Sequence, residues 1–348
     1  MARARVAALA TILLVMVSGE AAVAGDSDCY KGEALLTANP ASVVSACRGL
    51  AEQGNAQAQY NLGHLYQSGR GVPQDYNEAM KWYRKSADQG FADSQNNLGV
   101  LYANGLGVPQ DYKEAARWYS KAAEQGDANA QNNLGALYAD GLGVPQDYTE
   151  AVKWYRMAAE RGVAWAQNSL GAMYATGRGV GQDYGESMRW YRKAADQGLA
   201  FAQSSVGEMY FAGLGVPRDY AEAVKWYRKA ADQGFAAAEA NLAGMYAKGY
   251  GVEQDYAQAM QWCRKAADQG FAGAQKQIGV MYHFGYGVPK DPVQAYFWYA
   301  LATASLGSSA DGHQVQRLRD QIAASLTPAQ IAEAEKLVKA WKPRNETP

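Results

Sequence analysis

The three histidines of the chain, His64, His283 and His313, are the side chains best suited to bind a metal ion or to transfer a proton. Two metal ligands on one helix face would need a spacing such as His-Glu-x-x-His, and the sequence contains no such motif. Each histidine is therefore interpreted as a solvent-facing or groove-lining side chain. We expect no metal site and no cofactor.

The other motifs that could perform catalysis are also missing or have a simpler explanation. Serine-type hydrolysis would need Ser-x-x-Lys, Lys-Thr-Gly or Gly-x-Ser-x-Gly, and the sequence contains none of them. A Gly-x-Gly motif occurs seven times, but it lacks the further residues of a phosphate-binding loop, which favours a structural turn. Recurring carboxylates such as Asp75 and Glu78 occupy helix-capping positions. We predict that the protein is not an enzyme.

The charge balance argues against polyanionic partners. The chain has 33 basic and 34 acidic residues, with a net charge of −1, and its cations recur mainly on one face of each predicted second helix. A solvated helix face explains this pattern better than a binding surface for phosphates does. We expect no nucleic-acid partner.

The first 24 residues resemble a secretory signal peptide. Met1–Arg5 is basic, the run Val6–Val17 is apolar apart from Thr11, and Ala22-Val23-Ala24 has the small-x-small pattern of a cleavage site. An apolar run of 12 residues is too short to span a bilayer, which needs about 20. We expect cleavage after Ala24, no stable membrane insertion, and a periplasmic or secreted protein.

Residues 55–306 repeat with a period of 36 residues, which gives seven units. In each unit a first apolar stripe, as at Ala58, Leu62 and Tyr66, is followed by a second that is rich in Trp, Tyr and Ala. Both stripes have helical spacing. Below, repeat position 1 is the first residue of a unit. The units begin at Asn55, Phe91, Asp127, Val163, Leu199, Phe235 and Phe271.

Turn and capping residues mark where these helices begin and end. Two glycines in a Gly-x-Gly-Val-Pro-Gln-Asp segment end the first helix, and an Asp such as Asp75, with Glu78 three residues later, predicts a capping box at the start of the second. Each unit is therefore predicted to be a pair of helices. Because a single pair cannot bury its aromatic side chains, neighbouring pairs must stack.

Both ends of the array need caps. Residues 25–54 are predicted to form an N-terminal tail and a capping helix. Residues 307–348 are predicted to form two closing helices and a tail, with a capping box at Thr327 and Gln330.

The three cysteines fall into two classes. Export to an oxidising compartment favours a bridge between Cys29 and Cys47, although the spacing alone leaves the reduced form open. Cys263 replaces a tyrosine that recurs at a core-facing position of the other six units, which indicates a buried, inert thiol.

The motif Ala-x-x-x-Leu-Gly-x-x-Tyr-x-x-Gly-x-Gly-Val, followed by Ala-x-x-Trp-Tyr-x-x-Ala-Ala-x-x-Gly, resembles the Sel-1-like (SLR) repeat family, relatives of tetratricopeptide repeats. Residues 130–162 carry it in full, and the departures are local, at Gly181, Ala243-Gly244, Glu253 and Cys263. The resemblance implies an all-α fold, a right-handed α-solenoid of seven helix-turn-helix repeats, acting as an adaptor between proteins.

If the repeats stack like tetratricopeptide repeats, repeat positions 3, 6, 10 and 13 of the first helices should line a concave groove. Position 6 supplies Tyr60 and a row of asparagines that could hydrogen-bond an extended peptide. The middle units add aromatic anchors and one carboxylate. The alternative, that the asparagines are soluble filler and the aromatics pack into neighbouring loops, stays open. The predicted groove residues are Tyr60, Asn96, Asn132, Trp165, Asn168, Phe201, Glu208 and Phe211.

We therefore expect a non-enzymatic scaffold of the bacterial cell envelope that binds an exported protein or an extended peptide in this groove. The alternatives are a cell-wall glycan binder or an envelope hydrolase, because some members of the family carry a β-lactamase label, and a structural component that assembles through its ends. The oligomeric state is not predicted.

Overall fold

The computed structural model describes Cys29 and residues 40–344. The expected signal peptide lies outside these residues. Within them the chain forms 17 α-helices and no strand, which confirms the all-α class. None of these helices is both long enough and apolar enough to cross a membrane.

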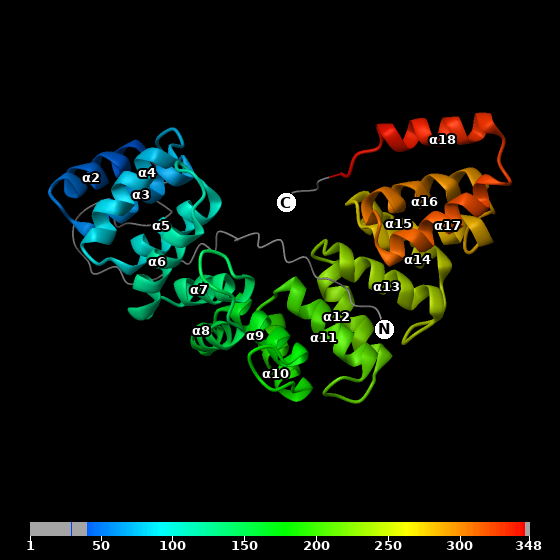
Figure 1. Cartoon of the computed structure of the whole chain (residues 1–348), viewed down its shortest axis with the longest axis horizontal. Helices are drawn as coiled ribbons and strands as arrows, with labels where there is room; N and C mark the ends of the chain where they lie inside the picture. Colours follow the sequence, from blue (N-terminus) through cyan, green and yellow to red (C-terminus); the bar gives the residue numbers. More distant parts are fainter. Residues whose placement is uncertain (1–28, 30–39, 345–348) are drawn as a thin grey trace. The chain divides into compact units, whose positions relative to one another are not determined.

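The chain divides into two compact units between Gln182 and Asp183, and each unit is described by itself (Figure 1). The first unit contains α2 (Pro40–Glu52), α3 (Ala56–Ser68), α4 (Tyr76–Asp88), α5 (Ala92–Asn104), α6 (Tyr112–Glu124), α7 (Ala128–Asp140), α8 (Tyr148–Glu160) and α9 (Ala164–Thr176). The second contains α10 (Tyr184–Asp196), α11 (Ala200–Ala212), α12 (Tyr220–Ala231), α13 (Ala236–Lys248), α14 (Tyr256–Asp268), α15 (Ala272–Phe284), α16 (Pro292–Leu306), α17 (Ala310–Ala323) and α18 (Pro328–Ala340).

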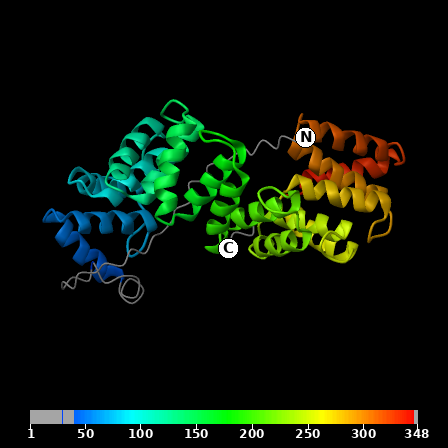
Figure 2. The same ribbon diagram turned by 90° about the horizontal axis from the view of Figure 1, so that it is seen from below.

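Within each unit, consecutive repeat helices pack against one another, as predicted for stacked helix pairs. In the first unit α3 packs on α4 and α4 on α5, and the same order holds from α10 to α16 in the second. Both closing helices, α17 and α18, pack on α16 (Figure 2). Their apolar side chains, Val315, Ile322 and Ala334 among them, join the core of the last repeat.

The helix boundaries follow the predicted caps, with one difference. The Asp75 carboxylate accepts hydrogen bonds from the backbone N–H groups of Asn77 and Glu78, at 2.9 and 3.1 Å. The Glu78 carboxylate does not complete a capping box, because it accepts from Lys81 Nζ at 2.5 Å. The complete capping box is formed at Thr327 and Gln330, as predicted.

The two loop glycines have different roles. Gly141 ends α7 with a φ of 70°, a left-handed conformation that favours glycine. At Gly143 a Cβ atom would lie 2.2 Å from the backbone of Tyr112. The loop therefore contacts the start of the preceding repeat's second helix through a glycine that has no room for a side chain.

In five of the repeats a tyrosine of the second helix lies against a glycine of the first. A Cβ atom on Gly99 would come within 2.5 Å of the Tyr119 ring, which is fully buried. In the sixth repeat the tyrosine is replaced by Cys263, and the facing glycine by Ala243. Cys263 is smaller than the tyrosine of the other repeats, and Ala243 is larger than their glycine. The two changes compensate each other, as close packing requires.

Buried glutamines connect successive repeats. Gln95 donates from Nε2 to the carbonyl oxygen of Ala87 in the preceding repeat, at 3.2 Å, and its Oε1 accepts from Gln125 at 2.7 Å. Gln203 makes the same pair of bonds in the second unit. At the equivalent position of the sixth repeat the residue is Glu239, which is 3% exposed.

A second link between repeats involves arginine, tyrosine and tryptophan. Arg84 donates to the Tyr102 hydroxyl at 2.7 Å and lies 4.8 Å from the ring centroid of Trp118, both in the next repeat. Arg228 contacts Tyr246 and Trp262 in the same way. A guanidinium over an indole ring adds cation–π attraction to the buried apolar area.

Two of the cysteines are joined and the third is buried. A disulfide connects Cys29 to Cys47, with the Cα atoms 4.7 Å apart, and the Cys29 carbonyl accepts from Asn61 Nδ2 at 3.0 Å. That this bond forms in the cell stays a prediction. Burial raises the pKa of the Cys263 thiol to about 12, so the reactive thiolate is scarce at neutral pH.

We expect Cys263→Tyr to lower the free energy of unfolding by about 1 to 3 kcal/mol, because the new ring would overlap the Ala243 side chain. Ala243→Gly alone should cost about 1 kcal/mol through helix propensity. In the double variant the glycine–tyrosine pair of the other repeats is restored. The double variant should therefore lose less stability than the two single variants lose together. Urea unfolding of the unchanged protein, the two single variants and the double variant measures these losses. Strict additivity of the losses would refute the packing argument.

We expect Glu239→Gln to raise the free energy of unfolding at pH 7 by about 1 kcal/mol, because an amide can donate to the preceding repeat's carbonyl as Gln203 does. It can also accept from Gln269, as Glu239 does now at 3.0 Å. Glu239→Ala should lower stability instead. A less stable Gln variant in urea unfolding would contradict the interpretation.

Candidate functional site

The predicted groove residues lie on first helices, as expected, but they fall into two sets. Tyr60, Asn96, Asn132, Trp165 and Asn168 belong to α3, α5, α7 and α9 of the first unit. The other three, Phe201, Glu208 and Phe211, all lie on α11 of the second unit. Each set is therefore a separate candidate surface.

Three half-buried asparagines of the first unit bond to one another. Asn133 Nδ2 donates to Asn96 Oδ1 at 3.1 Å, which links α7 to α5, and Asn132 Nδ2 donates to Asn133 Oδ1 at 3.5 Å. The Oδ1 atom of Asn168 is buried, and no residue of the described chain donates to it. Part of the hydrogen-bonding capacity of these amides is therefore used between repeats.

Tyr60 packs against two other aromatic rings, a contact that the sequence pattern did not predict. Its ring centroid lies 5.9 Å from that of Tyr83 and 5.4 Å from that of Phe91. Burial raises the pKa of Tyr60 to about 12, and the charges of Asp93 and Asp127 add to this effect. Tyr60 is therefore half-buried, with one part of its side chain packed in the protein and the rest accessible.

Two carboxyl groups next to Tyr60 were not predicted as part of the surface. Burial raises the pKa of Asp93, which shares a hydrogen bond with Asp127, and burial also raises the pKa of Asp127. Asp127 in addition caps α7 by accepting from the Ala130 N–H at 2.6 Å. The sequence signals were an acid at repeat position 3 and another at repeat position 1, where the other units carry uncharged residues.

The aromatic side chains predicted as anchors have different environments. Trp165 is half-buried. Phe201 is 47% exposed, although its ring centroid lies 4.5 Å from that of Phe235. Phe211 is 36% exposed, and its ring centroid lies 6.3 Å from that of Tyr250, in the neighbouring loop. Packing into loops, the alternative left open by the sequence, therefore applies to part of the Phe211 ring.

Glu208 lies on α11 between these two phenylalanines. Its side chain reaches solvent, yet burial of the carboxyl among neighbouring groups raises its pKa. Its charge contributes to the raised pKa values of Tyr191 and Tyr227. A carboxylate that is accessible but incompletely hydrated is well placed to bind a cation or a hydrogen-bond donor of a partner.

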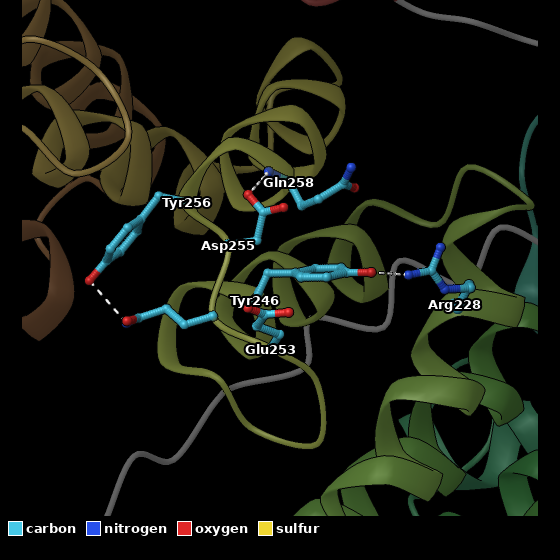
Figure 3. Close-up of a pocket in the computed structure, with 7 residues that line it drawn as sticks. Arg228, Tyr246, Glu253, Asp255, Tyr256 and Gln258 are labelled. Carbon is cyan, nitrogen blue, oxygen red and sulfur yellow. Dashed lines mark hydrogen bonds between the residues drawn. The ribbon is translucent and has the colours of Figure 1, made fainter.

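A depression of about 690 Å³ lies elsewhere on the second unit, between α12 and the start of α14 (Figure 3). Two of its polar side chains, Arg228 and Asp255, make structural hydrogen bonds. Arg228 donates to the Tyr246 hydroxyl, and Asp255 accepts from the Gln258 N–H at 2.9 Å, as the cap of α14 (Figure 3). Glu253 stands where most other repeats have the loop proline. These contacts stabilise the helices that line the depression.

Among the described residues, no cluster of three or more His, Cys, Asp or Glu side chains could hold a metal ion. The His283 ring stacks on Phe284, with centroids 4.3 Å apart. Its pKa is lowered by burial and by the charge of Lys290.

Comparison with known proteins identifies the repeat. The Sel1 repeat family matches seven consecutive segments, residues 56–91, 92–127, 128–163, 166–199, 200–235, 236–271 and 272–305. A Sel1 repeat protein from Oxalobacter formigenes is 36% identical, over 70% of this chain and 96% of that one, with a TM-score of 0.65.

A second solved structure is a protective antigen of uropathogenic Escherichia coli strains with an SLR fold. It is 31% identical over 86% of each chain, with a TM-score of 0.52. No match is found among curated proteins.

We expect Asp93→Asn to raise the melting temperature at pH 7. Because the folded-state pKa of this carboxyl is raised, its ionised form destabilises the folded chain, and that cost disappears as the pH falls below the unfolded value of about 4. The gain should therefore shrink at pH 3. Calorimetry at both pH values, with Glu333→Gln on α18 as control, tests this, and an equal gain at both would contradict it.

Proposed function

Because the chain belongs to the Sel1-repeat family, whose members are generally scaffolds for protein–protein interaction, we propose that it binds another protein through the outward faces of its first helices. The partner is an exported protein or an extended peptide segment of one. Binding involves recognition alone, without covalent chemistry.

The observation that carries this proposal is the arrangement of side chains on α11. Phe201 and Glu208 are seven residues apart and Phe211 follows three residues later, so the three share one face of the helix. Both phenylalanines are more than a third exposed, and the carboxyl between them is incompletely hydrated. Two apolar anchors flanking a carboxylate suit a peptide that carries apolar residues on either side of a Lys or Arg.

The first unit supports the same function with different chemistry. Its half-buried amides on α5 and α7 have donors and acceptors beyond those that pair Asn96 with Asn133. The carboxyl pair of Asp93 and Asp127 adds negative charge near Tyr60. Amides that bond a peptide backbone, together with carboxylates that attract its cations, are a common means of capturing extended segments.

The proposed location follows from the leader sequence. Residues 1–24 have the charge pattern and apolar length of a secretory signal peptide. We place the mature protein in the periplasm or outside the cell, where a disulfide between Cys29 and Cys47 would be stable.

Site-specific crosslinking tests the proposal. A photoreactive phenylalanine analogue at Phe201 should capture a partner in cells, whereas the same analogue at Lys225, exposed on α12, should not. With that partner purified, joint replacement of Trp165, Phe201 and Phe211 by Ala should weaken binding on the order of tenfold or more. Met157→Ala, which removes an exposed apolar side chain from α8, is the matched control.

Unchanged affinity in the triple variant, with its melting temperature preserved, would show that binding occurs elsewhere. Turnover of peptidoglycan fragments or of a β-lactam by the purified protein would favour the hydrolase alternative instead. Retention on peptidoglycan without turnover would favour a glycan binder.

A further inference from the structure

One link between neighbouring repeats lacks an arginine that the other links share. At repeat position 30 an arginine donates to the hydroxyl of the tyrosine at position 12 of the next repeat, and Arg48 of α2 makes the same bond to the first repeat. The arginines that make this bond are Arg48, Arg84, Arg156, Arg192, Arg228 and Arg264. In the second repeat the residue at position 30 is Ser120.

Most of these arginines also cover a tryptophan at position 28 of the next repeat. The Arg84 guanidinium lies 4.8 Å from the ring centroid of Trp118, while it donates to the Tyr102 hydroxyl at 2.7 Å. The same two contacts are made by Arg192, Arg228 and Arg264. The place of the guanidinium is thus defined by a phenolic oxygen that accepts its N–H and by an indole ring that it covers.

The third repeat supplies both of these partners but receives no arginine. Tyr138 and Trp154 occupy positions 12 and 28, and both pack on the same core cluster of the first unit. Among the described residues, none donates a hydrogen bond to the Tyr138 hydroxyl. Trp154 is half-buried, whereas Trp118 is 2% exposed. Because a serine side chain is much shorter than an arginine, part of the Trp154 ring stays accessible.

A second cation is missing from the same ring. At repeat position 31 a lysine usually lies over the tryptophan of its own helix, as Lys121 does over Trp118 with its ammonium 4.3 Å from the ring centroid. The lysines that do the same elsewhere are Lys85, Lys193, Lys229 and Lys265. In the third repeat this residue is Met157, which is uncharged and 37% exposed.

Four cations of α6 and α8 already have other partners. Arg117 pairs with Glu114, Lys153 pairs with Glu150, Lys121 lies over Trp118, and Arg156 donates to Tyr174. Lys153 is also 5.3 Å from the Trp154 ring centroid. The ring of Trp118 accommodates a guanidinium and an ammonium together. A guanidinium at Trp154 would meet no ammonium from position 31, so it would be repelled less than Arg84 is.

We propose that the place of the missing arginine, between the Tyr138 hydroxyl and the Trp154 ring, is a recognition site for an arginine side chain of a partner protein. The partner's guanidinium donates to the Tyr138 hydroxyl and covers the indole ring, as Arg84 does in the preceding link. Met157, three residues from Trp154 on the same helix face, offers a flexible apolar side chain to the methylene groups of that arginine.

The two contacts select arginine over lysine. A planar guanidinium can donate from its edge while its face lies on an aromatic ring, and an ammonium cannot do both in the same way. Position 30 of the chain shows the same preference, since five repeats carry arginine there and none carries lysine. The site contains none of the predicted groove residues, so it adds a separate requirement to the partner, an accessible arginine.

The variant Ser120→Arg should fill the site from within the chain. The risk to the fold is small, because the other links carry this residue. The melting temperature should rise by a few degrees as the new guanidinium covers Trp154. Ala221→Arg is the matched control, since it adds the same charge at an exposed position of α12 where the second repeat carries Lys113.

Binding can be followed by NMR through the indole N–H signal of Trp154, assigned with a Trp154→Phe variant. Three blocked peptides of equal length would differ at one residue, which is arginine, lysine or citrulline, the neutral analogue of arginine. The arginine peptide should shift the signal saturably, the lysine peptide should bind several-fold more weakly, and the citrulline peptide should have little effect. Ser120→Arg should abolish the response, and Ala221→Arg should preserve it.

A saturable response to the arginine peptide that persists in Ser120→Arg would overturn the proposal. So would equal responses to the arginine and citrulline peptides, or no response to the arginine peptide at millimolar concentration. The proposed function of the first-helix faces would survive each of these results, because its test uses other residues.

Discussion

The contact between a second-helix tyrosine and a first-helix glycine determines how each helix pair of this protein packs. The missing side chain of Gly99 lets the two helices approach until the Tyr119 ring is fully buried. The pairing of Ala243 with Cys263 shows the same constraint with both residue sizes changed. The first-helix positions that stay partly exposed, such as Asn96 and Phe201, are the ones that can contact other molecules.

Contacts between neighbouring repeats add stability that a single helix pair lacks. Buried glutamines and the arginine that covers the next repeat's tryptophan both cross from one repeat to the next. Where Ser120 replaces that arginine, the facing Trp154 is half-buried, whereas Trp118, which Arg84 covers, is 2% exposed. Stability therefore depends on adjacent repeats more than on a single central core.

Period, capping residues and glycines were sufficient to predict the helix pairs, their order and the buried face, because these features depend on residues within one repeat. The surface was predicted less completely, since it depends on contacts between repeats. The bond between Asn96 and Asn133, the carboxyl pair of Asp93 and Asp127, and the stack of Tyr286 on Tyr256 each join residues at least 30 positions apart. No local pattern indicates such pairs.

Neighbour-dependent stability is the claim on which the scaffold interpretation rests, and native-state hydrogen exchange of Gly207→Ala tests it most directly. The new methyl group would overlap the Tyr227 ring, 2.7 Å away, and loosen the fifth repeat. We predict that protection falls most in α11 and α12, less in α13 and α14, and hardly at all in α15 and α16. An equal loss of protection in all these helices would contradict the account, because it would indicate one shared core.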